Sequence, residues 1–426
     1  MENLKGKRLL VLGGSMWKDA IKAFTKQHEI TFIAAGLYHA GIFDVADESY
    51  IVDTVDADVM KKFVKDHQID GVYMGGSEFI IRSACKWIGD IGLPCYCTSE
   101  QWELLQDKGL FKNLCLKHGI PCVPRYQMNS DNIAFPVITK PTDGCGSCGF
   151  SVCRDKDELK VGYEKAFKES PTGSVIIEKF VKNDGVVVYY TIDDGKLVFS
   201  GLQDKFPVKY ATQGSYVAGM HVWESEYKEK FRDRFEKKLE KMAQSIGLKS
   251  GSFWIEVFHE GDNYYFNEVG FRYSGSVSIY PVDYFYGINQ VGADIYYALT
   301  GKNLLYGHSS IVSPKVPKKQ NYCVLNLHMK PGTIGKIEGL EEIRNLPECV
   351  FIADTKHVGD KVKSTGTVAQ VFAFVHFVFD GMNECKKIAK KIFNTIHVKD
   401  DDENEMICNM LDWESPRLIA ALEKDN

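Results

Sequence analysis

The chain has 426 residues, of which 44% are hydrophobic and 26% are charged, and its formal net charge at pH 7 is −5. This length is too great for one ordinary core, so two or three domains are expected. A slightly acidic chain with no long basic run is a poor nucleic-acid platform and a poor surface for anionic membranes. No stretch approaches the roughly 18 apolar residues of a membrane span, so no membrane partner is expected either.

The N-terminal segment MENLKGKRLLVLGG has basic residues before a short apolar run, LLVL, and no small-residue cleavage site follows it. We interpret it as a first strand rather than as a signal peptide. Twelve cysteines are scattered along the chain. Without an export signal, they predict reduced thiols and a cytoplasmic location.

Strand-like and helix-like segments alternate over the first hundred residues. The strand-like runs are RLLVLGG, EITFIAA, YIVD, GVYMGGSE and LPCYC, and amphipathic segments separate most of them. This alternation predicts an α/β domain, residues 1–105, built on a doubly wound parallel sheet. Ligands of such sheets bind at the carboxyl ends of strands, where this chain has the turns Gly13-Gly14-Ser15 and Gly75-Gly76-Ser77-Glu78. Tight strand-to-helix turns would explain either loop equally well.

Residues 106–310 predict a two-lobe α+β domain. Its expected elements are a helix over 99–119 with Ser99 as its cap, a hairpin turning at Asp194-Gly195, a charged helix over about 224–247, a second hairpin over 250–270 and a helix over 289–301. A polar, proline-bearing linker at 310–320 then leads to a small α+β domain, residues 320–426. Its expected strands are NYCVLNLHM and VFAFVHFVF, and its expected helix is MNECKKIAKKIFN.

The stretch VITKPTDGCGSCGFSVC, residues 137–153, has three competing interpretations. A dinucleotide loop would pass directly into a helix, but the residues after Gly149 are β-favouring, so the loop joins two strands. A zinc site needs a second ligand pair, and a redox C-x-x-C normally opens a helix; Cys145 and Cys148 have neither context. What remains is a small-residue hairpin that cradles phosphate with its backbone, with Lys140 just before it as a point charge.

The hairpin FWIEVFHEGDNYYFNEV carries Glu256 and Glu268. If its turn is centred on Asp262, the two carboxylates lie opposite each other on one face, which is destabilising without a cation. Magnesium bound by one or two carboxylates and by substrate phosphates would reverse this effect. A turn of even length would instead send them to opposite faces and leave an ordinary exposed pair. Together with a phosphate loop, the opposed pair points to Mg-ATP.

These features occur in a particular order: a doubly wound domain, Asp107-Lys108, the glycine hairpin, VIIEKFV, and FWIEVF followed by YYFNEVGFR. In this order they resemble the ATP-grasp superfamily of carboxylate–amine ligases, over roughly residues 1–310. The last hundred residues, with PGTIGKIEGLEEI, are more weakly similar to the C-terminal domain of L-amino-acid ligases and of biotin carboxylase.

The resemblance implies a set of site residues and a cofactor, ATP with magnesium, manganese being the alternative ion. It implies that a small lid lobe covers about 110–180 and that the hairpin closes over the β- and γ-phosphates. The implied residues are Lys108 and Lys140 for the α- and β-phosphates; Gly144, Gly146, Ser147 and Gly149 for the lid; Glu178, Lys179 and Val181 for adenine; Asp184 for ribose; Glu256 and Glu268 for magnesium; and Arg272 for the γ-phosphate or acyl phosphate.

One position departs from the family pattern. Gly270 stands two residues after Glu268, where the family usually has an asparagine as a further metal ligand. A second metal would therefore be held more weakly, or by Glu268 in bidentate fashion with water. Asp184 is the nearest acidic residue to the hinge, but the register of VVVYY leaves its match to the family's ribose ligand open.

The predicted reaction activates a carboxylate as an acyl phosphate and joins it to an amine, an amino acid being the expected substrate. The alternatives are a carbamoyl-phosphate-synthase-like or carboxylase-like ligase that uses bicarbonate, and an ATP-binding subunit without catalysis. Ser15, Glu78, His221 and Tyr273 are candidates for the substrate pocket. Dimers are common in the family, so a homodimer is one assembly that the resemblance allows.

Overall fold

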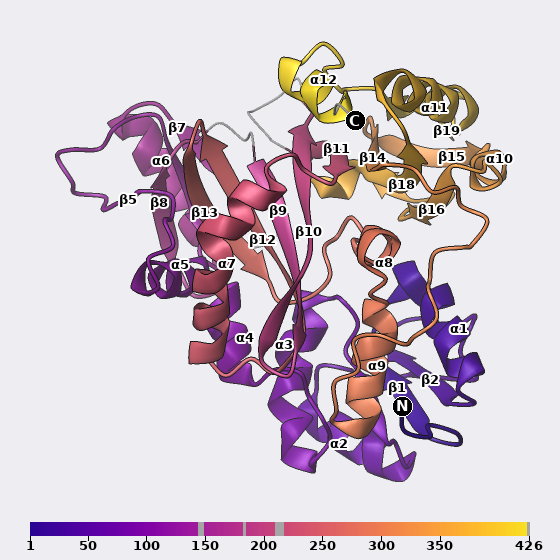
Figure 1. Ribbon diagram of the computed structural model, residues 1–426. Coiled ribbons are helices and arrows are strands. Elements are labelled where there is room, and N and C mark those ends of the chain that lie inside the picture. Colours follow the sequence, from indigo (N-terminus) through magenta and orange to yellow (C-terminus); the bar gives the residue numbers. More distant parts are fainter. Residues whose placement is uncertain (144–148, 182–184, 209–216, 424–426) are drawn as a thin grey trace.

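The computed structural model describes residues 1–143, 149–181, 185–208 and 217–423 (Figure 1). Its N-terminal sheet has the strand order β3-β2-β1-β4, and every neighbouring pair in it is parallel. This confirms the predicted parallel α/β domain. Its elements are β1 (Arg8–Val11), η1 (Ser15–Trp17), α1 (Lys18–Gln27), β2 (Thr31–Gly36), β3 (Glu48–Ile51), α2 (Ala57–Asp66), β4 (Gly71–Tyr73), α3 (Glu78–Trp87) and η2 (Gly89–Ile91).

The fifth strand expected at LPCYC is wrong. Residues 93–97 pair with no strand among the described residues and form the link to the next helix. The Cys95 thiol donates to the carbonyl oxygen of Cys97 at 3.0 Å, and Cys97 is buried. The apolar residues of this segment are therefore explained by burial rather than by sheet pairing.

The single helix expected over 99–119 is two helices, α4 (Ser99–Gln106) and α5 (Lys108–Lys117). Asp107 lies between them in an extended conformation and accepts a hydrogen bond from the Leu110 amide at 2.8 Å, so it caps α5. A side-chain oxygen that satisfies a free amide in this way favours a new helix start. The cap of α4 is Thr98, in a capping box with Gln101, and not Ser99 as predicted.

The small lobe is a four-stranded sheet of order β5-β8-β6-β7 with one helix beside it. Its elements are β5 (Arg125–Tyr126), β6 (Val137–Pro141), β7 (Ser151–Cys153), α6 (Lys156–Glu169) and β8 (Val175–Lys179). β6 and β7 are antiparallel, with Val137 opposite Cys153. The glycine segment therefore joins two strands, as predicted, which excludes the dinucleotide interpretation.

The large lobe and the C-terminal region share one sheet, whose order is β13-β12-β9-β10-β11-β14-β18-β16. The large-lobe elements are β9 (Gly185–Asp193), β10 (Lys196–Pro207), β11 (Ala218–Trp223), α7 (Lys228–Ser245), β12 (Ser250–Glu260), β13 (Asn263–Gly270), α8 (Ile279–Tyr286) and α9 (Gln290–Thr300). The β9–β10 hairpin turns at Asp194 and Gly195, as predicted, both at positive φ (49° and 82°).

The C-terminal strands join this sheet through the antiparallel pair β11–β14. A second, three-stranded sheet of order β17-β15-β19 lies in the same region. The elements are β14 (Asn321–Met329), β15 (Gly332–Glu338), α10 (Leu340–Arg344), β16 (Cys349–Asp354), β17 (Lys361–Val362), η3 (Val368–Gln370), β18 (Val371–Phe379), α11 (Met382–Thr395), β19 (His397–Asp400), β20 (Ile407–Cys408) and α12 (Pro416–Leu422). The predicted strands 321–329 and 371–379 are β14 and β18.

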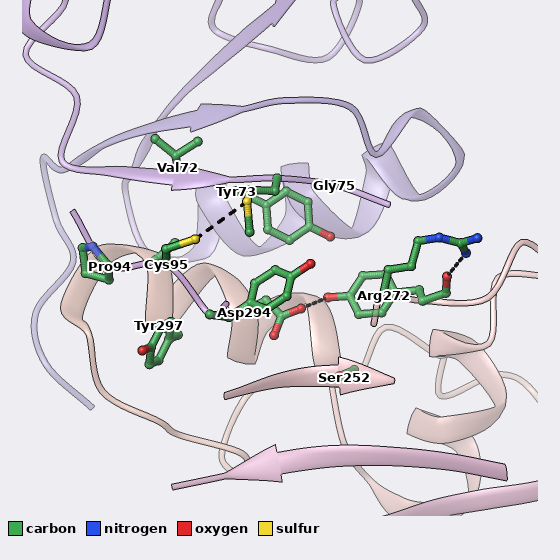
Figure 2. Close-up of a pocket in the computed structure, with 13 residues that line it drawn as sticks. Val72, Tyr73, Gly75, Pro94, Cys95, Ser252, Arg272, Asp294 and Tyr297 are labelled. Carbon is green, nitrogen blue, oxygen red and sulfur yellow. Dashed lines mark hydrogen bonds between the residues drawn. The ribbon is translucent and has the colours of Figure 1, made fainter. Parts of the chain in front are cut away.

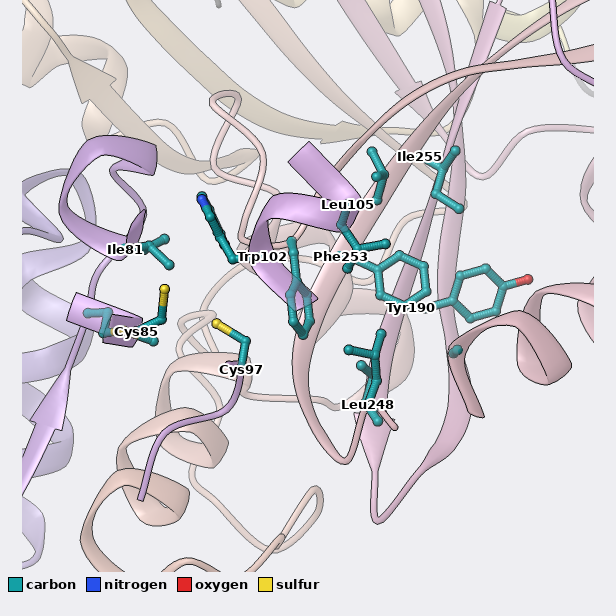
Figure 3. Packing of buried hydrophobic residues seen from close by; sticks show 14 of the residues in the cluster. Ile81, Cys85, Cys97, Trp102, Leu105, Tyr190, Leu248, Phe253 and Ile255 are labelled. Atoms are coloured by element: carbon teal, nitrogen blue, oxygen red, sulfur yellow. The ribbon is translucent and has the colours of Figure 1, made fainter. Parts of the chain in front are cut away.

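One apolar core joins the N-terminal domain to the large lobe (Figure 3). Ile81 of α3 and Trp102 of α4 are fully buried in it, together with Ile255 of β12. Burying such side chains gives on the order of 1.5–3 kcal/mol each, so the two domains are held firmly together. In the part of the chain that the structure describes, no helix is long and apolar enough to cross a membrane.

Candidate active site

Two lysines and a glutamate meet where the small lobe contacts the large lobe. Lys112 of α5 and Lys140 of β6 both approach the carboxylate of Glu178 in β8, Lys140 at 3.0 Å. Asn267 of β13 accepts a hydrogen bond from the Lys140 ammonium at 2.7 Å. Lys112 and Glu178 are fully buried, and Lys140 and Asn267 are nearly so. We call Lys112, Lys140, Glu178 and Asn267 the hinge cluster.

The charges of the hinge cluster depend on one another. Burial opposes the ionisation of Glu178, but the ammonium groups of Lys140 and Lys112 hold the pKa of Glu178 below its ordinary value. Burial, reinforced by the neighbouring Lys140, lowers the pKa of Lys112 to about 8. Burial also opposes the charged form of Lys140, but Glu178 and Glu268 raise its pKa. Lys140 therefore keeps its positive charge at neutral pH.

Glu256 of β12 and Glu268 of β13 lie directly opposite each other, as predicted. The turn is not centred on Asp262, however, because Glu260 pairs with Asn263 and leaves a turn of even length, two residues. That register alone would put the carboxylates on opposite faces. A β-bulge between Phe266 and Glu268 inserts one extra residue, Asn267, and restores the alignment.

Each carboxylate of this pair faces cationic or amide groups. The Lys205 ammonium lies 2.5 Å from one Glu256 oxygen, and the Asn267 amide donates to the other at 2.6 Å. The Lys108 ammonium lies 3.7 Å from Glu268. Burial opposes the ionisation of Glu268, but the surrounding ammonium groups, Lys108 first, hold its pKa below the ordinary value. Both groups thus belong to one charged network with the hinge cluster.

This network fits magnesium that is bound together with phosphates. It contains four lysines and three glutamates: Lys108, Lys112, Lys140 and Lys205, and Glu178, Glu256 and Glu268. The surplus of positive charge suits a polyanion. Among the described residues, no group of three or more His, Cys, Asp or Glu could form a closed metal cage. Two opposed carboxylates match magnesium, which usually takes one or two protein carboxylates and completes its shell with phosphates and water.

The structure explains why residue 270 is glycine. Gly270 pairs with Trp254 across the hairpin, and a Cβ at position 270 would lie 2.4 Å from the indole ring. The indole also contacts the Arg272 guanidinium, whose carbon lies 5.5 Å from the ring centroid. The space that the family's asparagine would need is therefore filled by tryptophan, and position 270 supplies no metal ligand.

Arg272 has a partner in the N-terminal domain. Its guanidinium donates two hydrogen bonds to Glu78 at the start of α3, one of them at 3.1 Å, and a third to the Tyr273 carbonyl oxygen at 2.7 Å. Both Arg272 and Glu78 were predicted site residues, for phosphate and for substrate respectively. The structure brings these two together, and the contact of Arg272 with phosphate stays a prediction.

The predicted adenine site is described in part. The Lys179 amide donates to the Pro124 carbonyl oxygen at 2.9 Å, its ammonium pairs with Glu260 at 2.8 Å, and Val181 is buried. The Glu178 side chain faces the two lysines of the hinge cluster rather than an open surface. Its contact with adenine, and those of Lys179 and Val181, stay predictions.

The lid residues fall mostly outside the described part of the chain. Gly144, Gly146, Ser147 and Asp184 lie outside it, as do both cysteines of the C-x-x-C. Gly149 is described and has φ +74°, and a Cβ there would lie 2.9 Å from the Pro141 ring. Glycine is thus required at the end of this loop by both conformation and space.

His221, a candidate for the substrate pocket and for a general base, is a buried neutral imidazole. It lies 2.8 Å from the Gln203 amide nitrogen. Burial, followed by the neighbouring charge of Lys205, lowers its pKa to about 3. At neutral pH such an imidazole is too weak a base to take a proton from an ammonium group.

Three residues of the site were not predicted: Lys112 and Lys205 of the charged network, and Asn267 of the hinge cluster. Lys112 follows Lys108 by four residues on one helix, and this spacing places both on one face, so a signal for it existed. Asn267 had no such signal, because strict strand alternation puts it on the face opposite Glu268. Only the bulge brings both side chains to the site.

Comparison with known proteins agrees with this geometry. Residues 133–279 match the ATP-grasp domain family, in agreement with the resemblance noted in the sequence. It is 22% identical over 343 residues to the carbamoyl phosphate synthase large chain of Clostridium perfringens, covering 76% of this chain and 32% of that one.

Two solved structures share the fold over nearly the whole chain. L-amino acid ligase from Bacillus licheniformis has a TM-score of 0.72 at 17% identity, covering 93% of this chain and 99% of that chain. The biotin carboxylase domain of Hydrogenobacter thermophilus 2-oxoglutarate carboxylase, in complex with MgADP, ADP and bicarbonate, has a TM-score of 0.73 at 17% identity, covering 98% and 94%. The chain spans only 32% and 39% of the length of two curated relatives that it matches.

Proposed function

We propose that this chain is an ATP-dependent ligase that activates a carboxylate as an acyl phosphate and joins it to an amine, with release of ADP and phosphate. The observation that carries the proposal is the opposed pair Glu256 and Glu268, with Lys108 and Lys140 beside it. Opposed carboxylates among ammonium groups are the arrangement expected where a divalent cation and phosphates bind together.

The roles of the residues follow from charge and position. Lys108 and Lys140 neutralise the α- and β-phosphates, and Glu178 with Asn267 fixes the Lys140 ammonium in place. Magnesium held by Glu256 and Glu268 would supply further neutralisation of phosphate charge. Arg272 would meet the charge that develops on the transferred phosphoryl group. Phosphoryl transfer of this kind depends on positioning and electrostatics and needs no covalent protein intermediate.

An amino acid as one substrate is supported by the shared fold with an L-amino acid ligase over 93% of the chain. The alternative is bicarbonate as the carboxylate, and it is supported by the shared fold with a biotin carboxylase domain and by the match to carbamoyl phosphate synthase. The two alternatives differ in the small molecule that must be present for ADP to form.

The test is ADP release from ATP and magnesium, with pooled amino acids in one series and bicarbonate in another. Amino-acid-dependent release supports the proposal, and bicarbonate-dependent release supports the alternative. Tight ATP binding with no turnover in either series would identify a subunit without catalysis. Glu268→Gln should lose turnover at saturating ATP, whereas Glu226→Gln, a change of a carboxylate on the exposed surface, should not.

A further inference from the structure

A second polar site lies between the N-terminal domain and the large lobe (Figure 2). The cavity has a volume of about 20 Å³, enough for one water-sized guest. It opens beside the carboxyl end of β4. Its lining comes from residues 72–75 and 94–96 on one side and from Ser252, Arg272, Tyr273, Asp294, Tyr297 and Ala298 on the other. We call it the Asp294 cavity.

Asp294, on α9, is the one carboxylate in the lining. It accepts a hydrogen bond from the Tyr273 hydroxyl, and no ion pair joins it to a cation within the described ranges of the chain. Arg272 is the only cationic residue in the lining, and its guanidinium is held by Glu78. Figure 2 shows the Asp294 carboxylate turned toward the tyrosine hydroxyl and Arg272 directed away from it.

Asp294 is partly shielded from water, and a carboxylate that loses hydration costs free energy unless a cation or a proton neutralises it. Here burial raises the pKa of Asp294 to about 7, and the Tyr273 hydrogen bond opposes this only in part. With this pKa the group is only partly ionised at neutral pH. A cationic guest would restore full ionisation.

The rest of the lining suits a small organic cation. Tyr73, Tyr96, Tyr273 and Tyr297 supply four aromatic rings with hydroxyl groups. Aromatic faces attract cations, and hydroxyl oxygens accept N–H donors. The small volume excludes a bulky head group but admits one ammonium group, and the carbon attached to it would lie toward the opening.

The cavity lies beside the strand that carries a predicted metal carboxylate. Arg272 lines it and follows Glu268 by four residues, so at most about 13 Å of chain separates the two. A guest in the cavity would thus be bound near the site proposed for acyl-phosphate formation, on the side of the N-terminal domain.

We propose that the Asp294 cavity binds the protonated amino group of a compact primary amine, with Asp294 as its counter-ion. Its identification as the amine-substrate site rests on the proposed ligase function, but the binding does not. The amine is held as an ammonium ion between Asp294 and the tyrosine hydroxyls. Bulkier or fully alkylated ammonium ions are excluded.

The experiment measures binding without ATP, so its outcome is separate from that of the ADP-release assay. Thermal unfolding and calorimetric titration are performed at pH 8 with methylammonium, potassium or tetramethylammonium chloride at equal ionic strength. We expect methylammonium alone to raise Tm, by at least about 2 °C, and to give a saturable titration. Equal shifts with all three salts, or none with methylammonium, would overturn the proposal.

Single substitutions test whether the rise in Tm with methylammonium comes from binding in the Asp294 cavity. Asp294→Asn should lose the methylammonium shift, whereas Asp44→Asn, which alters an exposed carboxylate, should keep it. Tyr273→Phe removes the hydroxyl that favours the ionised carboxylate, so the pH at which methylammonium gives half its effect should rise. This second variant decides the question if Asp294→Asn fails to fold: an unchanged midpoint would overturn the role of Asp294.

The effect of methylammonium on Tm should depend on pH through the charge of Asp294. The titratable or charged groups that line the cavity around Asp294 are Tyr73, Tyr96, Tyr273, Tyr297, Cys95 and Arg272. Burial keeps the pKa of Tyr73 and Tyr273 above the ordinary value, so those hydroxyls stay neutral at pH 8. The methylammonium effect should therefore fade as the pH drops below about 7, where Asp294 takes up a proton. Persistence of the effect at pH 5 would contradict the proposal.

Discussion

The hinge cluster and the Asp294 cavity both shield a carboxylate from water, fully for Glu178 and partly for Asp294, and they differ in how the charge is balanced. In the hinge cluster, Glu178 has two ammonium groups beside it, and its pKa stays below the ordinary value. In the cavity, Asp294 has one hydroxyl, and its pKa rises to about 7. Burial acts in the same direction on both. The number of nearby cations supplied by the chain decides the direction of the pKa shift. The chain itself neutralises Glu178 in the hinge cluster, whereas Asp294 forms no ion pair with a cation among the described residues and is proposed to bind an external one.

The largest expected effect is the loss of ATP affinity when a charge is removed from the hinge cluster. Lys140→Met deletes the ammonium group that contacts Glu178 and Asn267 and that is proposed to bind phosphate. We expect affinity for a non-hydrolysable ATP analogue to fall at least about 100-fold, or ~2.8 kcal/mol, measured by calorimetry. Lys62→Met, an exposed lysine, is the matched control. Equal affinity in the two variants would remove Lys140 from the phosphate site.

Lys112→Met tests how much the neutralisation of Glu178 contributes to stability, because Lys112 is fully buried and contacts that carboxylate. Removing one partner of a buried ion pair usually costs about 3–5 kcal/mol, and Lys140 remains here, so we expect a loss of about 3 kcal/mol. Urea unfolding measures it. Lys112→Arg should retain more of the stability because it keeps the charge. A methionine variant as stable as the parent would mean that Lys140 alone balances Glu178.

Gly270→Ala tests whether packing against Trp254 excludes a side chain, and so a further metal ligand, at position 270. The new Cβ would lie 2.4 Å from the Trp254 indole, and overpacking of this kind costs about 1–3 kcal/mol. The double variant with Trp254→Ala should recover part of the loss, and a double-mutant cycle in urea unfolding measures the coupling. Additive losses would show that Trp254 is not the obstacle.

The smallest effect is the dependence of stability on pH, and the two sites predict opposite signs. Asp294 titrates near pH 7 in the folded chain against an ordinary value of 3.8, so its stabilising contribution is full below that value and is lost as pH rises through 7. Glu178 and Glu268 have pKa values below the ordinary 4.5, so their contributions are present above pH 4.5 and are lost as the pH falls further.

Thermal unfolding between pH 3 and pH 8, without amine present, measures this difference, because the contributions of Glu178 and Glu268 are lost only below the ordinary value of 4.5. Asp294→Asn should remove the decline toward pH 8 and leave the acid-side loss unchanged. Methylammonium should flatten the same decline in the parent chain, since a bound cation replaces the proton. An unaltered profile in the variant would mean that Asp294 does not titrate in this range.

The sequence predicted what depends on local pattern. Alternation located the parallel sheet and the glycine hairpin, and continuous apolar runs located β14 and β18. The pairing of Glu256 with Glu268 was correct, but for a reason that differs from the real one. The turn has an even length instead of a centre at Asp262, and a bulge at Asn267 restores the alignment of the two carboxylates.

What the sequence did not reveal depends on contacts between distant segments. Nothing near Glu78 in the sequence indicates that it holds Arg272, which is 194 residues away. The contact of Trp254 with Gly270 appears only when the hairpin register is known. Asp294 lay within a helix that was predicted correctly, yet its partial shielding from water comes from residues such as Tyr73 and Tyr273, which belong to other segments.

The continuous sheet has a consequence for how this chain can be divided. The proline-bearing linker at 310–320 suggests a natural place to cut, but β14 pairs along β11 and covers its backbone. A chain that ended at the linker would leave β11 as a bare edge strand, with unpaired amide and carbonyl groups that recruit strands from other molecules. We therefore expect residues 1–310 alone to aggregate. The unit that folds as one includes the last hundred residues.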